Sequence, residues 1–93
     1  MKFRKAFGEI VRETRNDLGL TMREVSSRGS MALSYLSEVE QGRKEASSEI
    51  LECIAAGLGV PLSKLIQATA IRIRIHEPID IADFQFDELG LVV

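Results

Sequence analysis

Apolar residues recur every three or four positions over the first two thirds of the chain, which is the period of amphipathic helices. The first such segment runs from Phe3 to Leu18 and carries charged residues on its other face. The residues that recur at three- and four-residue steps are Phe3, Phe7, Ile10, Val11, Thr14 and Leu18. Gly19 follows at the place where a C-terminal cap is expected. The pattern predicts a first helix over this segment.

Two short helices are predicted next. Thr21 followed three residues later by Glu24 is the signature of a capping box, which marks the start of a helix over about Met22–Arg28. Gly29-Ser30 breaks that helix, and a third is predicted from about Ala32–Glu40.

Two further helices are predicted after a polar connection. Ser47 or Ser48 can cap the fourth helix, and Gly59 closes it. Its apolar stripe consists of Ile50, Leu51, Ile54, Ala55 and Leu58. Pro61 suits the first turn of a fifth helix. The inward residues of the fifth helix are Leu62, Leu65 and Ile66.

The period changes toward the end of the chain. Isoleucine alternates with arginine over Ile71–Ile75, and this two-residue repeat of β-branched residues favours a strand. A continued helix is the alternative, because it would bring Ile66, Thr69 and Ile73 onto one side. Residues 79–93 then mix large apolar side chains with acids. We therefore expect a helical domain over residues 3–69 and an acidic, apolar C-terminal segment over residues 70–93, for dimerisation or partner binding.

Composition narrows the class of protein. The chain has 93 residues, 45% of them hydrophobic and 28% charged, as expected of one soluble globular domain. No stretch approaches the ~18 apolar residues of a membrane helix, and no signal-peptide core follows the basic N-terminus, so we expect a cytoplasmic protein without membrane association. One cysteine and one histidine exclude an intrachain disulfide and argue against a zinc site. No nucleophile–base or metal-ligand spacing is present, so we expect neither an enzyme nor a cofactor.

The charge is unevenly distributed. Residues 1–76 carry a net charge of +3 and residues 77–93 a net charge of -5, which together give the formal net charge of -2. This asymmetry permits a basic face on the body of the protein.

The two short helices around Gly29-Ser30 are the most informative feature. A short helix, a tight turn and a second short helix, with apolar residues at Val25, Leu36 and Val39, form a helix-turn-helix arrangement. In that arrangement one helix braces against phosphates while the next enters the major groove, where each base pair shows a unique hydrogen-bonding pattern.

The stretch from Leu20 to Leu65 resembles the Cro/C1-type (Xre-like) helix-turn-helix family. The pieces that carry the resemblance are Leu20-Thr21, Tyr35-Leu36-Ser37, Glu40, Gly42 and Leu58-Gly59-Val60. Within that family, the residues Leu33, 35–40 and 44–49 are similar to actinobacterial regulators of Clp protease genes. The resemblance implies an all-α, five-helix, Cro/C1-repressor-like domain and, from its narrower part, an activator of stress-linked proteolysis genes.

The resemblance also implies roles for single residues. Leu33, Ser34 and Glu38 occupy the groove-facing positions of the recognition helix. There Leu33 can contact a thymine methyl, Ser34 can donate or accept a hydrogen bond, and Glu38 can accept one from a cytosine amino group. The residues placed at or near phosphates are Thr21, Tyr35, Ser37, Arg43 and Lys44. Met22 departs from the glutamine that is usual in the family and is not expected to contact DNA.

Each role has a structural alternative. Arg43-Lys44 can be a solvated loop, Glu38 an exposed helix residue, and Tyr35 an aromatic at the rim of the core. Arg15 and Glu40 resemble the family's buried ion pair between the first and third helices, which favours a structural role for both.

Three smaller points complete the residue assignments. Ser30 replaces the glycine common in the turn, and Gly29 is expected to absorb the strain. Cys53 is expected to be a small packing residue rather than a redox sensor. No partner that would make His76 a pH switch is evident.

We expect a homodimeric regulator that binds palindromic double-stranded DNA, because one such domain reads only a few base pairs. The apolar residues from Ile71 onward exceed what a closed five-helix core needs, so we expect them to pack against a second copy. A strand over Ile71–Ile75 would pair along its edge with the same strand of that copy. The alternative for this segment is that it folds back onto its own domain. The alternative is an antitoxin-like DNA-binding protein whose C-terminal segment binds a protein partner.

Overall fold

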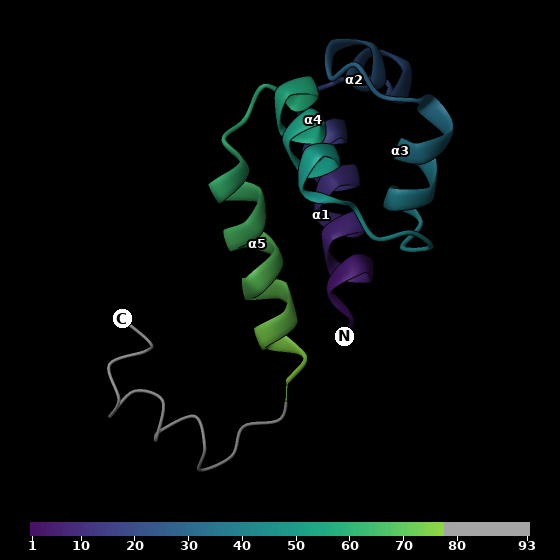
Figure 1. Cartoon of the computed structure of the whole chain (residues 1–93). Helices are drawn as coiled ribbons and strands as arrows, with labels where there is room; N and C mark the ends of the chain where they lie inside the picture. Colours follow the sequence, from purple (N-terminus) through teal and green to yellow (C-terminus); the bar gives the residue numbers. More distant parts are fainter. Residues whose placement is uncertain (78–93) are drawn as a thin grey trace.

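The computed structural model describes residues 1–77, and these residues form five helices with no strand among them. The helices are α1 (Phe3–Asp17), α2 (Met22–Arg28), α3 (Leu33–Glu40), α4 (Ser48–Leu58) and α5 (Leu62–Ile75). Helix α1 packs against α5 on one side and α3 on the other, while α4 overlaps α1 in this view and packs against α2 at the top of the molecule (Figure 1). The expected all-α, five-helix architecture is confirmed.

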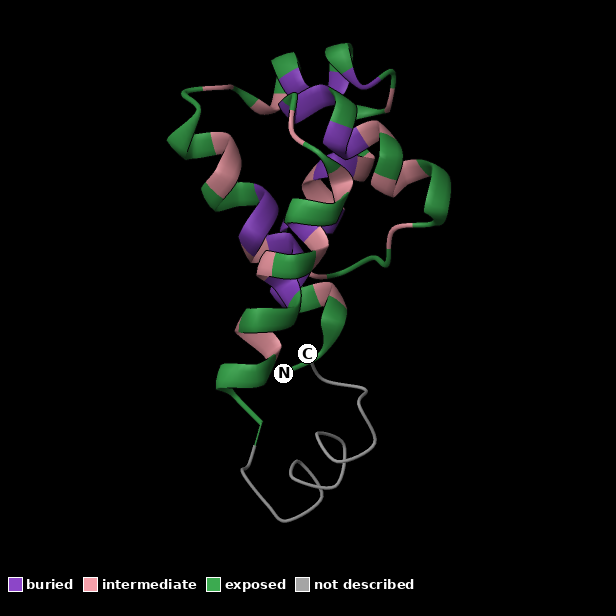
Figure 2. Cartoon of the chain, turned by 90° about the vertical axis from the view of Figure 1, so that its left-hand side faces the viewer, coloured by how far each residue is buried: buried purple, intermediate pink, exposed green. Residues whose placement is uncertain are grey.

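The core forms where the apolar stripes of the five helices meet (Figure 2). Its fully buried side chains are Phe7, Val11, Val25, Leu36, Val39 and Ile54, with Thr69 from α5. Burying a side chain of this size stabilises the fold by about 1.5–3 kcal/mol relative to leaving it in water. Because α2 and α3 each contribute to this core, their orientation is set by packing.

Helix boundaries follow the capping signals in the sequence. The Thr21 hydroxyl accepts a hydrogen bond from the Glu24 amide, and the Glu24 carboxylate accepts one from the Thr21 amide, which completes the expected capping box. The Ser47 hydroxyl caps α4, and Gly59 ends it in the left-handed region at φ 73°. Pro61 is the N-cap of α5 and immediately precedes its first turn.

The expected strand over Ile71–Ile75 is wrong, because α5 continues through these residues to Ile75. Helical spacing brings Leu65, Thr69 and Arg72 onto the side that faces α1, and the first two are buried there. Arg72 donates to the carboxylates of Glu9 and Glu13 on α1. These contacts of a helical register outweigh the β preference of the three isoleucines.

The predicted C-terminal segment lies mostly outside the described residues, which end at Glu77, so its apolar residues after Pro78 have no structural account. No single helix within residues 1–77 is long and apolar enough to span a membrane. Helices α4 and α5 reach that length and composition only as a pair, and the pair is bent by 105° at the junction.

Candidate nucleic-acid interface

The turn between α2 and α3 is tight and closed by backbone hydrogen bonds. The Gly29 amide donates to the Val25 carbonyl at 2.9 Å, and the Met31 amide donates to the Ser26 carbonyl at 2.9 Å. Ser30 takes the left-handed conformation at φ 56°. The expectation that Gly29 absorbs the strain is therefore wrong, since Gly29 has an ordinary φ of -88°.

Gly29 is needed for a different reason. A Cβ atom at this position would overlap the backbone carbonyl of Cys53 on α4. The absence of a side chain thus lets the end of α2 lie directly against α4. Cys53 itself is half-buried at this junction, in agreement with the expected packing role.

Helix α3 buries one side and leaves the other accessible. Leu36, Val39 and Glu40 are buried, whereas Leu33 and Ser34 at its beginning are exposed. Ser34 and Glu38 are four residues apart and therefore lie one above the other on the side away from the buried residues. This outer side carries Ser34, Ser37 and Glu38, whereas Leu33 lies above Leu36 and is exposed because it begins the helix. None of the three residues predicted to face the groove, Leu33, Ser34 and Glu38, is buried.

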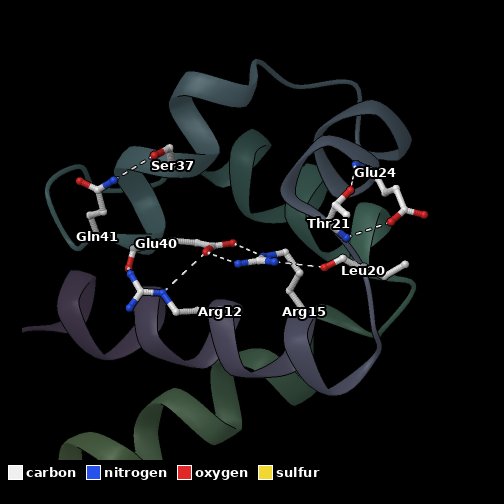
Figure 3. Close-up of polar contacts among 8 residues, drawn as sticks. All are labelled: Arg12, Arg15, Leu20, Thr21, Glu24, Ser37, Glu40 and Gln41. Atoms are coloured by element: carbon white, nitrogen blue, oxygen red, sulfur yellow. Dashed lines mark hydrogen bonds and ion pairs between the residues drawn. The ribbon is translucent and has the colours of Figure 1, made fainter.

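A buried ion pair holds α3 against α1 (Figure 3). Arg15 donates from Nε to Glu40 Oε2 at 2.8 Å and from Nη2 to Glu40 Oε1 at 3.0 Å, a bidentate geometry. The Glu40 side chain is 3% exposed and that of Arg15 is 14% exposed. The hydrogen bond to Glu40 raises the pKa of Arg15 above its usual value. The expected structural role of this pair is confirmed.

Arg12 and Leu20 extend the same junction in a way that sequence reasoning missed. Arg12 donates from Nη2 to the Glu40 backbone carbonyl at 3.1 Å, and Arg15 Nη1 donates to the Leu20 carbonyl at 3.1 Å (Figure 3). The sequence does carry a signal for the role of Arg12. It lies three residues before Arg15, and this spacing places both arginines on one side of α1. Arg12 and Arg15 together therefore tie α1 to the segment just before α2 and to the end of α3.

The loop from α3 to α4 carries the predicted cationic residues. Arg43 and Lys44 are both exposed. The Lys44 ammonium lies 4.8 Å from the centroid of the Tyr35 ring, so this loop lies beside α3. Tyr35 is half-buried and donates its hydroxyl proton to the Glu45 carbonyl at 3.0 Å.

The beginning of α2 forms a separate part of the surface. Thr21 is exposed, and it lies apart from Ser37 (Figure 3). Hydrogen bonds from the backbone and side chain of Thr21 lower the pKa of the Glu24 carboxyl. An open depression here is lined by Thr21, Arg23, Glu24, Ser27 and Arg28. Sequence reasoning did not single out Arg23 and Ser27, although their i, i+4 spacing on the outer face of a bracing helix was available.

Gln41 is a further residue that sequence reasoning missed. Its side-chain amide donates to the Ser37 hydroxyl oxygen at 3.0 Å (Figure 3). That bond leaves the Ser37 hydroxyl proton free to donate outward. Within residues 1–77 no group of three or more His, Cys, Asp or Glu side chains is placed to hold a metal ion.

Comparison with known proteins agrees with this arrangement. A helix-turn-helix family model matches residues 11–65. The transcriptional regulator ClgR of Mycobacterium tuberculosis is 46% identical over 63 residues, which are 68% of this chain and 56% of ClgR. The chain therefore spans little more than half the length of the curated ClgR relatives it matches.

Solved structures show the same fold. The crystal structure of the clp gene regulator ClgR from C. glutamicum matches with a TM-score of 0.70 and 37% identity, covering 75% of this chain and 91% of that one. The restriction-modification controller protein C.Esp1396I matches with a TM-score of 0.74 over 82% of this chain and 99% of its own. Its identity is only 18%, so this second likeness concerns the fold alone.

Proposed function

Because the chain belongs to the helix-turn-helix family, we propose that it is a sequence-specific DNA-binding transcriptional regulator. The observation that carries the proposal is the accessible polar side of α3, which is held in place by packing against α1 and α2 and by the Arg15–Glu40 pair. A short helix with one packed side and one polar side can enter the major groove without disturbing the core beneath it.

Within this function, we assign two kinds of DNA contact. Ser34 and Glu38 would read base edges, because they lie on the outer side of α3. Leu33 would contact a thymine methyl from the beginning of the helix, where its side chain is 38% exposed. Thr21, Ser37, Arg43 and Lys44 would contact phosphates, which fix position without reading sequence.

The proposed active form is a homodimer. On α5, Ile71 is 55% exposed and Ile75 is 73% exposed, and their i, i+4 spacing places them together on the side away from α1. This apolar face supports pairing with a second copy, although through helices instead of the expected strands. Twofold pairing would match a palindromic site with half-sites about 34 Å apart.

The proposed target genes follow from the relatives. The clp gene regulator ClgR from C. glutamicum shares 37% identity with this chain, and the transcriptional regulator ClgR of Mycobacterium tuberculosis shares 46%. We therefore infer control of Clp protease genes, with activation as the direction expected from the sequence resemblance.

The test is selection of genomic fragments by the purified full chain, followed by sequencing. The proposal expects enrichment of one motif with twofold symmetry, with fragments upstream of Clp protease genes among the strongest. A reporter driven by such a fragment should rise with protein level. Recovery of fragments without any common sequence would contradict DNA-sequence recognition, and a common motif remote from those genes would contradict only the target assignment.

A further inference from the structure

Tyr35 makes two contacts with the loop that follows α3. Its hydroxyl donates to the backbone carbonyl of Glu45 at 3.0 Å, and its ring lies 4.8 Å below the Lys44 ammonium. The Glu45 carboxylate is in turn 3.8 Å from Arg4 Nη1 on α1. The backbone on one side of Lys44 and the side chain of Lys44 itself are thus both held by one residue of α3.

The hydroxyl of Tyr35 has a single proton, and the Glu45 carbonyl uses it. While this bond exists, Tyr35 cannot donate to a phosphate oxygen. A tyrosine oxygen that can only accept has no attraction for an anion. The role at a phosphate expected from the family resemblance therefore requires this bond to break first.

The contact with the Tyr35 ring restricts the conformations of the Lys44 side chain. A lysine side chain is flexible and loses much rotamer freedom when it is held at one place. The electron-rich face of an aromatic ring attracts the ammonium and limits that freedom before DNA arrives. The ammonium keeps its charge and its exposure, so it can still meet a phosphate.

We propose that Tyr35 is a positioning residue that presents Lys44 to the DNA backbone and does not itself bind phosphate. The inference rests on the proposed function, because it concerns how this chain contacts DNA. The proposal has a consequence that can be measured: removal of the uncharged Tyr35 side chain should change the salt dependence of DNA binding.

The experiment measures the affinity of the full chain for one random-sequence duplex across a salt series. Lys44→Ala should lower the magnitude of the log affinity–log salt slope by about one, because one fewer counterion is released. Tyr35→Leu, which removes both the ring and the hydroxyl, should lower it by a substantial part of that amount. Tyr35→Phe should keep the slope, because the ring stays beneath Lys44.

A double-mutant cycle supplies the second readout and does not depend on Tyr35→Leu folding. Tyr35→Phe should weaken binding about three- to tenfold in the wild-type chain, as expected for one hydrogen bond, and by less than about twofold in the Lys44→Ala chain. In the Arg43→Ala chain, the matched control, the full effect of Tyr35→Phe should persist. Far-UV circular dichroism checks that each variant is folded.

A wild-type slope for a folded Tyr35→Leu chain would overturn the proposal, as would an equal effect of Tyr35→Phe with and without Lys44. Either result would mean that Tyr35 acts on DNA independently of Lys44. These results leave the proposed function intact. A wild-type chain that binds no duplex at any salt concentration would instead overturn both.

Discussion

Removal of Glu40 should destabilise the domain more than any other single loss of charge on α3. Glu40→Ala leaves the Arg15 guanidinium, whose side chain is 14% exposed, without its bidentate partner. Breaking a buried pair in this way costs about 3–5 kcal/mol. We expect the low end, about 3 kcal/mol, because Arg15 keeps its hydrogen bond to the Leu20 carbonyl and some contact with water.

The assays are urea unfolding and thermal unfolding of the full chain, both followed by far-UV circular dichroism. For a domain of this size, a loss of about 3 kcal/mol lowers Tm by roughly 12–24 °C. Glu38→Ala is the matched control, because it also removes a glutamate carboxylate from α3, but at a half-buried position. It should change the free energy of unfolding by about 0.5 kcal/mol or less.

A third variant separates charge pairing from packing. Replacing both partners with apolar residues, as in Arg15→Met with Glu40→Leu, should cost less than Glu40→Ala alone, because no buried charge remains unpaired. If Glu40→Ala and Glu38→Ala unfold at the same urea concentration, the ion pair does not hold α3 on α1, and the reasoning is refuted.

Three further predictions follow from the same structure. Lys44→Ala should weaken binding to all duplexes alike, whereas Glu38→Ala should change the preferred base at one position by about 1–3 kcal/mol; competition assays in which the two effects are exchanged would contradict the assignment. Ile71→Glu should convert a dimer to monomers in sedimentation, while Ser63→Glu, an exposed position two turns away and on a different face of α5, should not; a dimeric Ile71→Glu chain would place the interface elsewhere. Gly29→Ala should destabilise by about 1–3 kcal/mol because its Cβ meets the Cys53 carbonyl, and by more than Gly19→Ala, where φ is +70° but the space is open. Equal stability of Gly29→Ala and wild type would refute the proposed close contact of α2 with α4.

The helices were predictable because their signals are local. Apolar spacing, the Thr21–Glu24 capping box and Gly59 each act within a few residues of where they stand, so boundaries were placed within one or two positions. The error at Ile71–Ile75 has a non-local cause. The contacts of Arg72 with Glu9 and Glu13 join residues about sixty positions apart, and no local pattern reveals them.

The candidate site shows the same division. The outer side of α3 follows directly from helical spacing, so Ser34 and Glu38 could be chosen from the sequence. Backbone contacts could not be foreseen in the same way. The bond from Tyr35 to the Glu45 carbonyl and the approach of Gly29 to the Cys53 carbonyl depend on how whole elements pack.

The central claim, sequence-specific recognition of double-stranded DNA, is tested most directly by one ratio of affinities. The full chain is titrated against a duplex that carries the selected palindromic motif and against a scrambled duplex of the same composition, at one stated salt concentration. We predict that the motif binds about a thousandfold more tightly or better, within the range of specific regulators. Equal affinities for the two duplexes would contradict the claim.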